Sequence, residues 1–161
     1  MRKSFKELLC AIPIVFITLL DVYVKRWVTA HVRWQDDVAL IPGVAHLTYV
    51  ENTGAAFGIL ANARWMFVVL GAIVMAAILW FVFVKKVFGS GTAVLISMSL
   101  VYAGTLGNWL DRLLKGYVVD MFELEFMRFG IFNVADMALT CGAVLFCVWM
   151  LFNAKDKRES E

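Results

Sequence analysis

Two aspartates carry the strongest chemical signal in this sequence, because each lies among apolar neighbours with no cation within a helical turn. Asp120 is in the run Tyr117-Val-Val-Asp-Met-Phe122, and Asp136 is in Ile131-Phe-Asn-Val-Ala-Asp-Met-Ala138. Desolvation raises the pKa of a carboxyl group, and two carboxyl groups held close together do not both ionise easily. In such a pair one carboxylate can take a proton from water while its protonated partner polarises a carbonyl, as in aspartic proteases.

Asn133 stands three residues before Asp136, at a spacing that suits a helix N-cap. Asp136 would then lie in the first turn, where the helix dipole favours the ionised form, so we expect Asp136 to be the more acidic member of the pair. Apolar-flanked aspartates at membrane depth are also typical of a proton- or ion-coupled relay. A small transporter and a purely structural membrane subunit therefore remain alternatives on these residues alone.

Further polar residues occur within apolar segments, and each needs a partner or a function there. Asp21 and Lys25 are four residues apart with the acid first, the favourable order for an ion pair within one helix. This pair is either an interfacial ion pair or a structural support for a site.

A second group of polar and small residues falls on one face of a later helix by the three-and-four rule. Its members are Gly104, Asn108, Asp111 and Arg112. A glycine on such a face favours close helix packing. The planar guanidinium of Arg112 suits a carboxylate or a carbonyl better than lipid.

The composition indicates which kind of protein positions these residues. The chain has 161 residues, of which 62% are hydrophobic and 17% charged, against roughly 45–50% and 25% in soluble domains. The apolar excess predicts an integral membrane protein. Four segments are long enough to cross a bilayer, at residues 8–28, 65–84, 92–110 and 134–152. The net charge is only +2 and there is no basic stripe, so we expect no nucleic-acid partner.

The distribution of Lys and Arg predicts the orientation of these spans. Basic residues are densest in three short stretches that share one side, namely Arg2, Lys3, Lys6, Lys85, Lys86, Lys155, Lys157 and Arg158. This density places both termini in the cytoplasm and the connections 29–64 and 111–133 on the outer side.

The first outer connection contains a Pro42-Gly43 turn between two β-prone runs within residues 38–50, which predicts a small sheet at the membrane surface. The second connection is predicted to be a loop. The expected fold is therefore an all-α integral membrane protein, one membrane domain over residues 1–161, with four transmembrane helices and a small extracytoplasmic β-sheet between spans one and two.

Neither cysteine nor histidine placement predicts a metal site. Cys10, Cys141 and Cys147 lie inside apolar runs, as lipid-facing or packing residues would. His31 and His46 are fifteen residues apart in the first outer connection and are expected to be surface residues rather than ligands.

Five short motifs in register extend these inferences. They are Asp21 with Lys25, Asn52-Thr-Gly-Ala-Ala-Phe-Gly58, Gly107-Asn-Trp-Leu-Asp-Arg112, Tyr117-Val-Val-Asp120 and Phe132-Asn-Val-Ala-Asp136. In this order the motifs closely resemble those of the bacterial lipoprotein signal peptidases, also called signal peptidase II or aspartic peptidase family A8.

The resemblance implies an intramembrane aspartyl endopeptidase. Members of that family remove the signal peptide from prolipoproteins that carry a diacylglyceryl group on the lipobox cysteine, cutting just before that cysteine. The resemblance implies no metal and no cofactor, lipid-modified prolipoproteins and membrane phospholipid as partners, and a monomer. It also implies a multi-pass protein of the bacterial cell inner (cytoplasmic) membrane, with its active site near the outer face.

The resemblance also implies roles for individual residues. Asp120 and Asp136 would be the catalytic pair. Those that would bind substrate or support the site are Asn52, Gly54, Asn108, Arg112 and Asn133. Structural support near the site would come from Asp21, Lys25 and Gly104. Residues 38–50 would form a surface cradle and residues 58–63 a short helix over the site, while residues 121–130 match no motif and receive no role.

Overall fold

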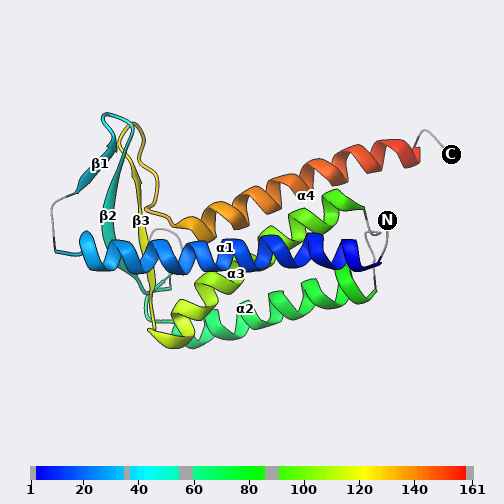
Figure 1. Cartoon of the computed structure of the whole chain (residues 1–161), viewed down its shortest axis with the longest axis horizontal. Coiled ribbons are helices and arrows are strands. Elements are labelled where there is room, and N and C mark those ends of the chain that lie inside the picture. Colours follow the sequence, from blue (N-terminus) through cyan, green and yellow to red (C-terminus); the bar gives the residue numbers. More distant parts are fainter. Residues whose placement is uncertain (1–2, 35–36, 55–59, 86–90, 159–161) are drawn as a thin grey trace.

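The structure is a computed structural model that describes residues 3–34, 37–54, 60–85 and 91–158. Four long helices extend from a small β-sheet, which lies at one end of them (Figure 1). The helices are α1 (Lys3–His31), α2 (Arg64–Ile78), α3 (Thr92–Leu114) and α4 (Val134–Arg158), and a π-helix, η2 (Leu79–Val84), continues α2. The strands are β1 (Val38–Ile41), β2 (Ala45–Asn52) and β3 (Val118–Leu124).

Three helices among the described residues are long and apolar enough to cross a membrane. These spans are Arg64–Val82, Thr92–Leu114 and Val134–Phe152. The α3 span is 50% buried, whereas the spans of α2 and α4 are 22% and 17% buried. The helix α3 is therefore central and packs against α1, α2 and α4, while α2 and α4 turn most of their apolar surface outward. The fold is thus of the helical membrane type that the composition predicts.

Glycines allow α3 and α4 to approach closely. A side-chain carbon on Gly104 would collide with the backbone carbonyl of Ala135, and one on Gly142 would lie 2.6 Å from the carbonyl oxygen of Ser97. Such contacts are too short for any Cβ atom, so these positions require glycine. The first turn of α4 is consequently held directly against the middle of α3.

The sheet corrects one prediction from the sequence. Its three strands are antiparallel in the order β1-β2-β3. The β1–β2 hairpin lies where the sequence predicts it, with Gly43 at a φ of +74° in the turn. The loop predicted for residues 111–133 is wrong, because α3 continues to Leu114 and residues 118–124 form β3. Pairing with a strand about 70 residues earlier is a long-range contact that local sequence does not indicate.

The sheet rests on the end of α1. Val28 and Val32 of α1 form a buried cluster with Leu47 of β2 and with Val119 and Met121 of β3. Val119 and Met121 alternate along β3 and therefore face α1, while Val118 and Asp120 are buried on the opposite face. This contact fixes β3, and with it Asp120, relative to the helices.

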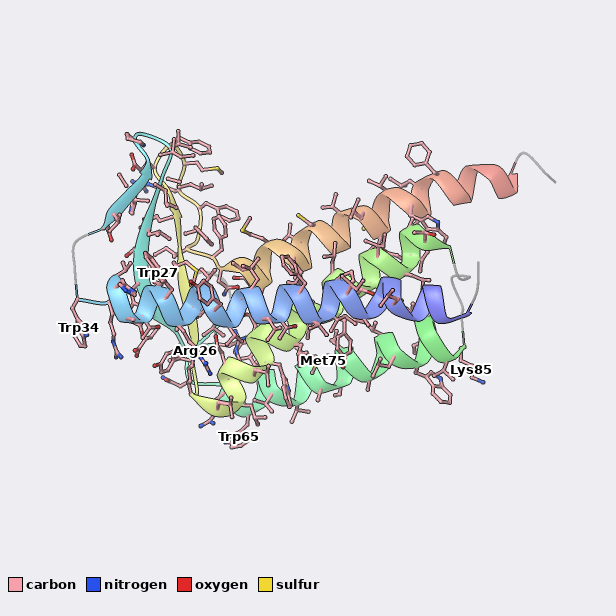
Figure 2. The ribbon with its side chains drawn as sticks, viewed as in Figure 1. Arg26, Trp27, Trp34, Trp65, Met75 and Lys85 are labelled. Carbon is pink, nitrogen blue, oxygen red and sulfur yellow. The ribbon has the colours of Figure 1, made fainter. Side chains whose placement is uncertain are left out.

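Exposed tryptophans are found at the sheet end of the helices. Trp27, Trp34 and Trp65 lie at this end, whereas Lys85 lies at the opposite end of α2 and η2 (Figure 2). Their exposed fractions are 43%, 84% and 65%. Trp80, which is 50% exposed and lies beside Lys85, is at that opposite end. Tryptophan is enriched where a membrane meets water, and exposed tryptophans are thus found towards both ends of the helices.

Candidate active site

Asp120 and Asp136 come from different elements and line the same cavity of about 470 Å³. Asp120 is in β3, where it pairs with Val50 of β2, and Asp136 is in the first turn of α4. The wall beside them is mainly apolar and includes Phe129, Ile131 and Met137. The fold thus brings together two carboxyl groups that are 16 residues apart in the sequence.

Asp120 is buried, with 3% of its surface exposed. Its Oδ2 accepts a hydrogen bond from Asn52 Nδ2 at 2.9 Å, and its Oδ1 accepts one from Asn133 Nδ2 at 2.6 Å. Burial raises the pKa of the Asp120 carboxyl to about 6, and the charge of Asp136 adds to this rise against the opposing effect of the two asparagines. Asp120 can therefore hold a proton close to neutral pH.

Asn133 caps α4 and connects the two aspartates. Its Oδ1 accepts a hydrogen bond from the Asp136 backbone N–H at 3.0 Å, and its own N–H donates to Asp136 Oδ2 at 3.2 Å. This reciprocal pair is a capping box, in which side chains satisfy two otherwise free donors. Because the Asn133 amide also donates to Asp120, one residue fixes the positions of both carboxyl groups.

Asn108 on α3 holds the other oxygen of Asp136. Its Nδ2 donates to Asp136 Oδ1 at 2.7 Å. Its Oδ1 accepts hydrogen bonds from Lys25 Nζ at 3.0 Å and from Asn133 Nδ2 at 3.2 Å. Two donors on Oδ1 leave only one orientation for the amide, so Nδ2 must face Asp136.

A buried ionic network lies behind Asn108. Lys25 Nζ donates to Asp21 Oδ2 at 2.8 Å and forms an ion pair with Asp111 Oδ2 at 3.0 Å. Asp21 Oδ1 in turn accepts a hydrogen bond from the Ala135 N–H at 3.0 Å, one of the free donors of the first turn of α4. The network therefore connects α1, α3 and the helix start that carries Asp136.

Arg112 closes another side of the cavity. Its Nη2 donates to the Gly54 carbonyl at 2.8 Å, and its guanidinium lies over the Phe67 ring at 4.6 Å from the centroid. The Gly54 N–H donates to Asn52 Oδ1 at 2.9 Å, which leaves Asn52 Nδ2 directed at Asp120. Arg112 thus holds the segment that positions Asn52.

The residues predicted from the sequence lie at the cavity or close behind it. The cavity is lined by Asn52, Asn108, Arg112, Asp120 and Asp136. Asn133 bridges the two aspartates, Gly54 contacts Arg112, and Asp21, Lys25 and Gly104 lie behind. The predicted helix over residues 58–63 falls partly outside the described residues; residues 60–62 form a turn, with Leu60 and Asn62 at positive φ.

Several cavity residues were not identified from the sequence. Phe129 and Gly130 belong to the segment that received no role, and no local motif marks them. Thr140 and Cys141 also line the cavity, although Cys141 was interpreted only as a lipid-facing or packing residue. Thr140 is four residues after Asp136 and so lies on the same helix face, which was a usable signal, whereas the five-residue spacing of Cys141 is not one.

Comparison with known proteins extends the similarity beyond single motifs. Residues 13–152 match the family model described as Signal peptidase (SPase) II. A lipoprotein signal peptidase of Streptococcus thermophilus (strain CNRZ 1066) is 43% identical over 137 residues, which are 84% of this chain and 88% of that protein. A lipoprotein signal peptidase of Lactococcus lactis subsp. lactis (strain IL1403) is 38% identical over 152 residues, 94% of this chain and 99% of that protein.

Two solved structures share the fold. A bacterial membrane enzyme structure determined by the in meso method at 2.3 Å resolution has a TM-score of 0.86 at 30% identity, covering 99% of this chain and 94% of the other. A second, at 1.9 Å resolution, has a TM-score of 0.79 at 30% identity over 92% and 94% of the two chains.

These comparisons give no support to the transporter alternative. The family match spans the capped start of α4, the strand that carries Asp120 and the helix that carries Asn108. The chain therefore belongs to the signal peptidase II family of aspartic peptidases.

Proposed function

We propose that this protein is a membrane endopeptidase that removes signal peptides from lipid-modified prolipoproteins, with Asp120 and Asp136 as its catalytic pair. The reaction class follows from the family and from relatives that are lipoprotein signal peptidases. The observation that supports the pair most strongly is that Asn133 hydrogen-bonds to both carboxyl groups at the wall of one cavity.

The two carboxyl groups have different surroundings and so suit different roles. Asp136 lies in the first turn of α4, where its two oxygens accept hydrogen bonds from Asn108 Nδ2 and from the Asn133 N–H. Asp120 is buried with a pKa raised to about 6. The Asp136 carboxylate takes a proton from the attacking water, while protonated Asp120 donates a hydrogen bond to the scissile carbonyl oxygen. The tetrahedral intermediate then collapses: the carbonyl re-forms, the C–N bond breaks, and Asp136 passes the proton taken from water to the leaving amine, which restores the starting state of the pair.

The cavity suits a substrate that is itself anchored in lipid. Its wall is formed largely by apolar side chains such as Phe129, Ile131 and Met137. The exposed face of α4 continues this apolar surface through Val144 and Leu145. The acyl chains of a diacylglyceryl cysteine can remain in the bilayer there while the peptide bond before that cysteine reaches the carboxyl groups.

We also propose the topology in which this reaction takes place. The helix α1 is the fourth span of a single membrane domain, residues 1–161, since Ile12, Val15, Phe16 and Leu19 are all more than half exposed. The start of α1 and the end of α4 lie away from the sheet (Figure 1). The density of Lys and Arg at that end favours cytoplasmic termini, with the sheet and cavity at the outer face of the bacterial inner membrane. In this topology the protein is a monomer surrounded by phospholipid.

Cleavage of a defined substrate tests this proposal. The purified chain in detergent is incubated with a prolipoprotein that carries a diacylglyceryl cysteine, and the products are identified by mass spectrometry. We expect a product that begins at the lipidated cysteine, and little cleavage of the same prolipoprotein without the lipid. Cleavage at another bond, or equal cleavage of both substrates, would contradict the proposed specificity.

The pH dependence of cleavage follows from Asp120. The active form of the pair holds one proton, and the raised pKa of Asp120 means that this proton is lost as the pH rises through about 6. We expect kcat/KM to fall on the alkaline side of this value by up to about tenfold per pH unit. Asn52→Ala removes a hydrogen bond that lowers the pKa of Asp120, so the alkaline limb should move to higher pH. A flat profile between pH 5 and pH 8 would be inconsistent with this assignment.

A further inference from the structure

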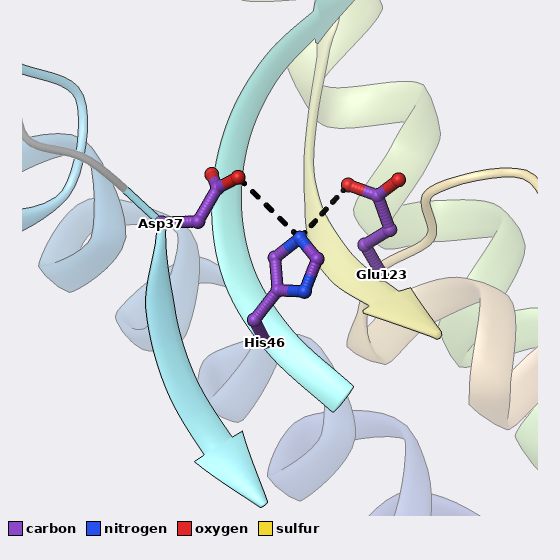
Figure 3. A group of neighbouring side chains, drawn as sticks. All are labelled: Asp37, His46 and Glu123. Carbon is purple, nitrogen blue, oxygen red and sulfur yellow. Dashed lines mark hydrogen bonds and ion pairs between the residues drawn. The ribbon is translucent and has the colours of Figure 1, made fainter. Parts of the chain in front are cut away.

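His46 of β2 lies between two carboxylates, one from the residue that precedes β1 and one from β3 (Figure 3). Its Nε2 is 3.1 Å from Glu123 Oε2 of β3 and 3.4 Å from Oδ2 of Asp37, the residue that precedes β1. His46, which the sequence predicts to be a surface residue rather than a ligand, therefore has close acidic neighbours. The register explains why: His46 pairs with Glu123 on one side and with Ala39, two residues after Asp37, on the other.

The spacing of these atoms is that of metal ligands. Zinc binds imidazole nitrogen and carboxylate oxygen at about 2.0–2.2 Å, so neighbouring ligand atoms of a tetrahedral site lie roughly 3.3–3.6 Å apart. The distances from His46 Nε2 are close to these values, and one ligand atom from each of Asp37, His46 and Glu123 lies within 4.8 Å of the other two. An ion can thus be accommodated by small side-chain rotations, without moving a strand.

The second ring nitrogen of His46 also has a carboxylate neighbour. Nδ1 lies 3.4 Å from Oε1 of Glu125, the residue that follows β3. Metal-binding histidines commonly donate their other N–H to a carboxylate, which fixes the tautomer and raises the basicity of the ligating nitrogen. With Nδ1–H directed at Glu125, the lone pair of Nε2 is directed between Asp37 and Glu123.

The cluster is accessible from outside the protein. A hollow lined by His46 and by residues 123–129 opens beside it. Water can therefore complete the coordination of an ion held by three protein ligands. This hollow is distinct from the cavity of Asp120 and Asp136, since Phe129 is the one residue among the described linings that both share.

We propose that Asp37, His46 and Glu123 bind a divalent transition-metal ion of the zinc type, with Glu125 orienting the imidazole. The nitrogen ligand favours such an ion over Mg²⁺ or Ca²⁺, which prefer oxygen alone. The ion joins β2 and β3 to the residue that precedes β1, and Glu123 is three residues from Asp120 in β3. Its role is to hold the sheet that carries Asp120, not to take part in peptide hydrolysis.

Protons compete with the metal for His46. Partial desolvation lowers the pKa of the imidazole, but hydrogen bonds to Glu125 and Glu123 and the charge of Asp37 outweigh this and raise it overall. An imidazolium surrounded by carboxylates is therefore the alternative state of the same cluster. Because the neutral ring is the metal ligand, metal binding should strengthen as the pH rises.

Metal titration of the full chain tests the proposal. The untagged protein in detergent is treated with EDTA, dialysed and titrated with CoCl₂ and ZnCl₂ at pH 8. We expect about one Co²⁺ per chain, visible d–d absorption, displacement by Zn²⁺ and a higher unfolding temperature with Zn²⁺. His46→Ala and Glu123→Gln should weaken binding at least about tenfold, whereas His31→Ala, which changes the other histidine, should leave it unchanged.

Several outcomes would overturn the site. They are the absence of saturable binding at millimolar metal, unchanged affinity in His46→Ala, and a thiolate-to-cobalt charge-transfer band, which would assign the metal to Cys141 or Cys147. Asp37→Asn provides a second variant if His46→Ala fails to fold, because Asp37 is exposed. Binding by Asp37→Asn equal to that of the parent would also contradict the proposed ligand set.

Discussion

Asparagine at position 120 or 136 is expected to reduce turnover of a lipid-modified prolipoprotein by at least about 10²–10⁴-fold, the usual contribution of a positioned acid or base. Asparagine keeps the size of each side chain but can neither accept the proton of water nor supply one to a carbonyl. Initial rates with the purified variants measure the effect. Because the two carboxyl groups act as a unit, the double variant should be little slower than either single variant.

The loss of activity must be separated from loss of folding. The pKa of Asp120 in the folded protein is raised from 3.8 to about 6, so protonation favours the folded state. This contribution is complete below pH 3.8 and is lost as the pH rises through about 6. At pH 7.5 the parent carries an unfavourable buried carboxylate that Asp120→Asn removes. The amide also sets an NH₂ group against the donating Nδ2 of Asn52 or Asn133, a cost that opposes this gain, so we expect the unfolding temperature to stay close to that of the parent.

Glu51→Gln provides a matched control for these variants. Glu51 is also a carboxylate of the sheet, next to Asn52, but its side chain is 36% exposed and pairs with Arg33. Its replacement should leave turnover unchanged, because surface ion pairs contribute little. Near-normal turnover by a folded Asp120→Asn or Asp136→Asn variant would require another pair of catalytic groups.

Lys25→Met is expected to destabilise the protein by about 3–5 kcal/mol, the range for removing one partner of a buried ion pair. Lys25 and Asp21 are each only 1% exposed, and Lys25 also contacts Asn108 and Asp111. Methionine fills similar space but leaves the Asp21 carboxylate without its cation. It also removes one donor that orients Asn108. The unfolding temperature in detergent and the cleavage rate should therefore both be lower than in the parent.

Two further variants make the Lys25 prediction specific. Lys115→Met removes the other cation of Asp111, which lies 2.8 Å from Asp111 Oδ1 but is 37% exposed, so it should cost less than about 1 kcal/mol. Asp21→Asn added to Lys25→Met removes the uncompensated charge and keeps an acceptor for the Ala135 N–H. It should restore part of the lost stability. Equal unfolding temperatures for Lys25→Met and Lys115→Met would contradict a buried network.

Features that depend on neighbouring residues were predictable from the sequence. The apolar runs predicted the helices, the Pro42-Gly43 dipeptide predicted the β1–β2 turn, and Asn133 before Asp136 predicted the cap that hydrogen bonds now display. Each rests on contacts between residues a few positions apart, which propensity and periodicity report directly.

Features that depend on distant residues were not predictable from the sequence. The strand β3 was predicted as loop because its pairing with β2 is invisible to local pattern, and the same register brings Glu123 to His46. The participation of Phe129 in the cavity wall likewise requires the folded chain. The residues of the site were predicted from their resemblance to family motifs. The contacts between these residues could not be predicted from the sequence.

By itself the sequence determined a membrane protein with two unusually placed aspartates, since buried charge is costly enough to be recognised wherever it occurs. Only the tertiary structure decided how those aspartates are held. Asn133 contacts both, Asn108 is oriented by Lys25 from another helix, and Asp120 is carried by a strand that packs on α1. Hydrogen bonds act over about 3 Å, so a site built from separate elements exists only once packing has brought them within that distance.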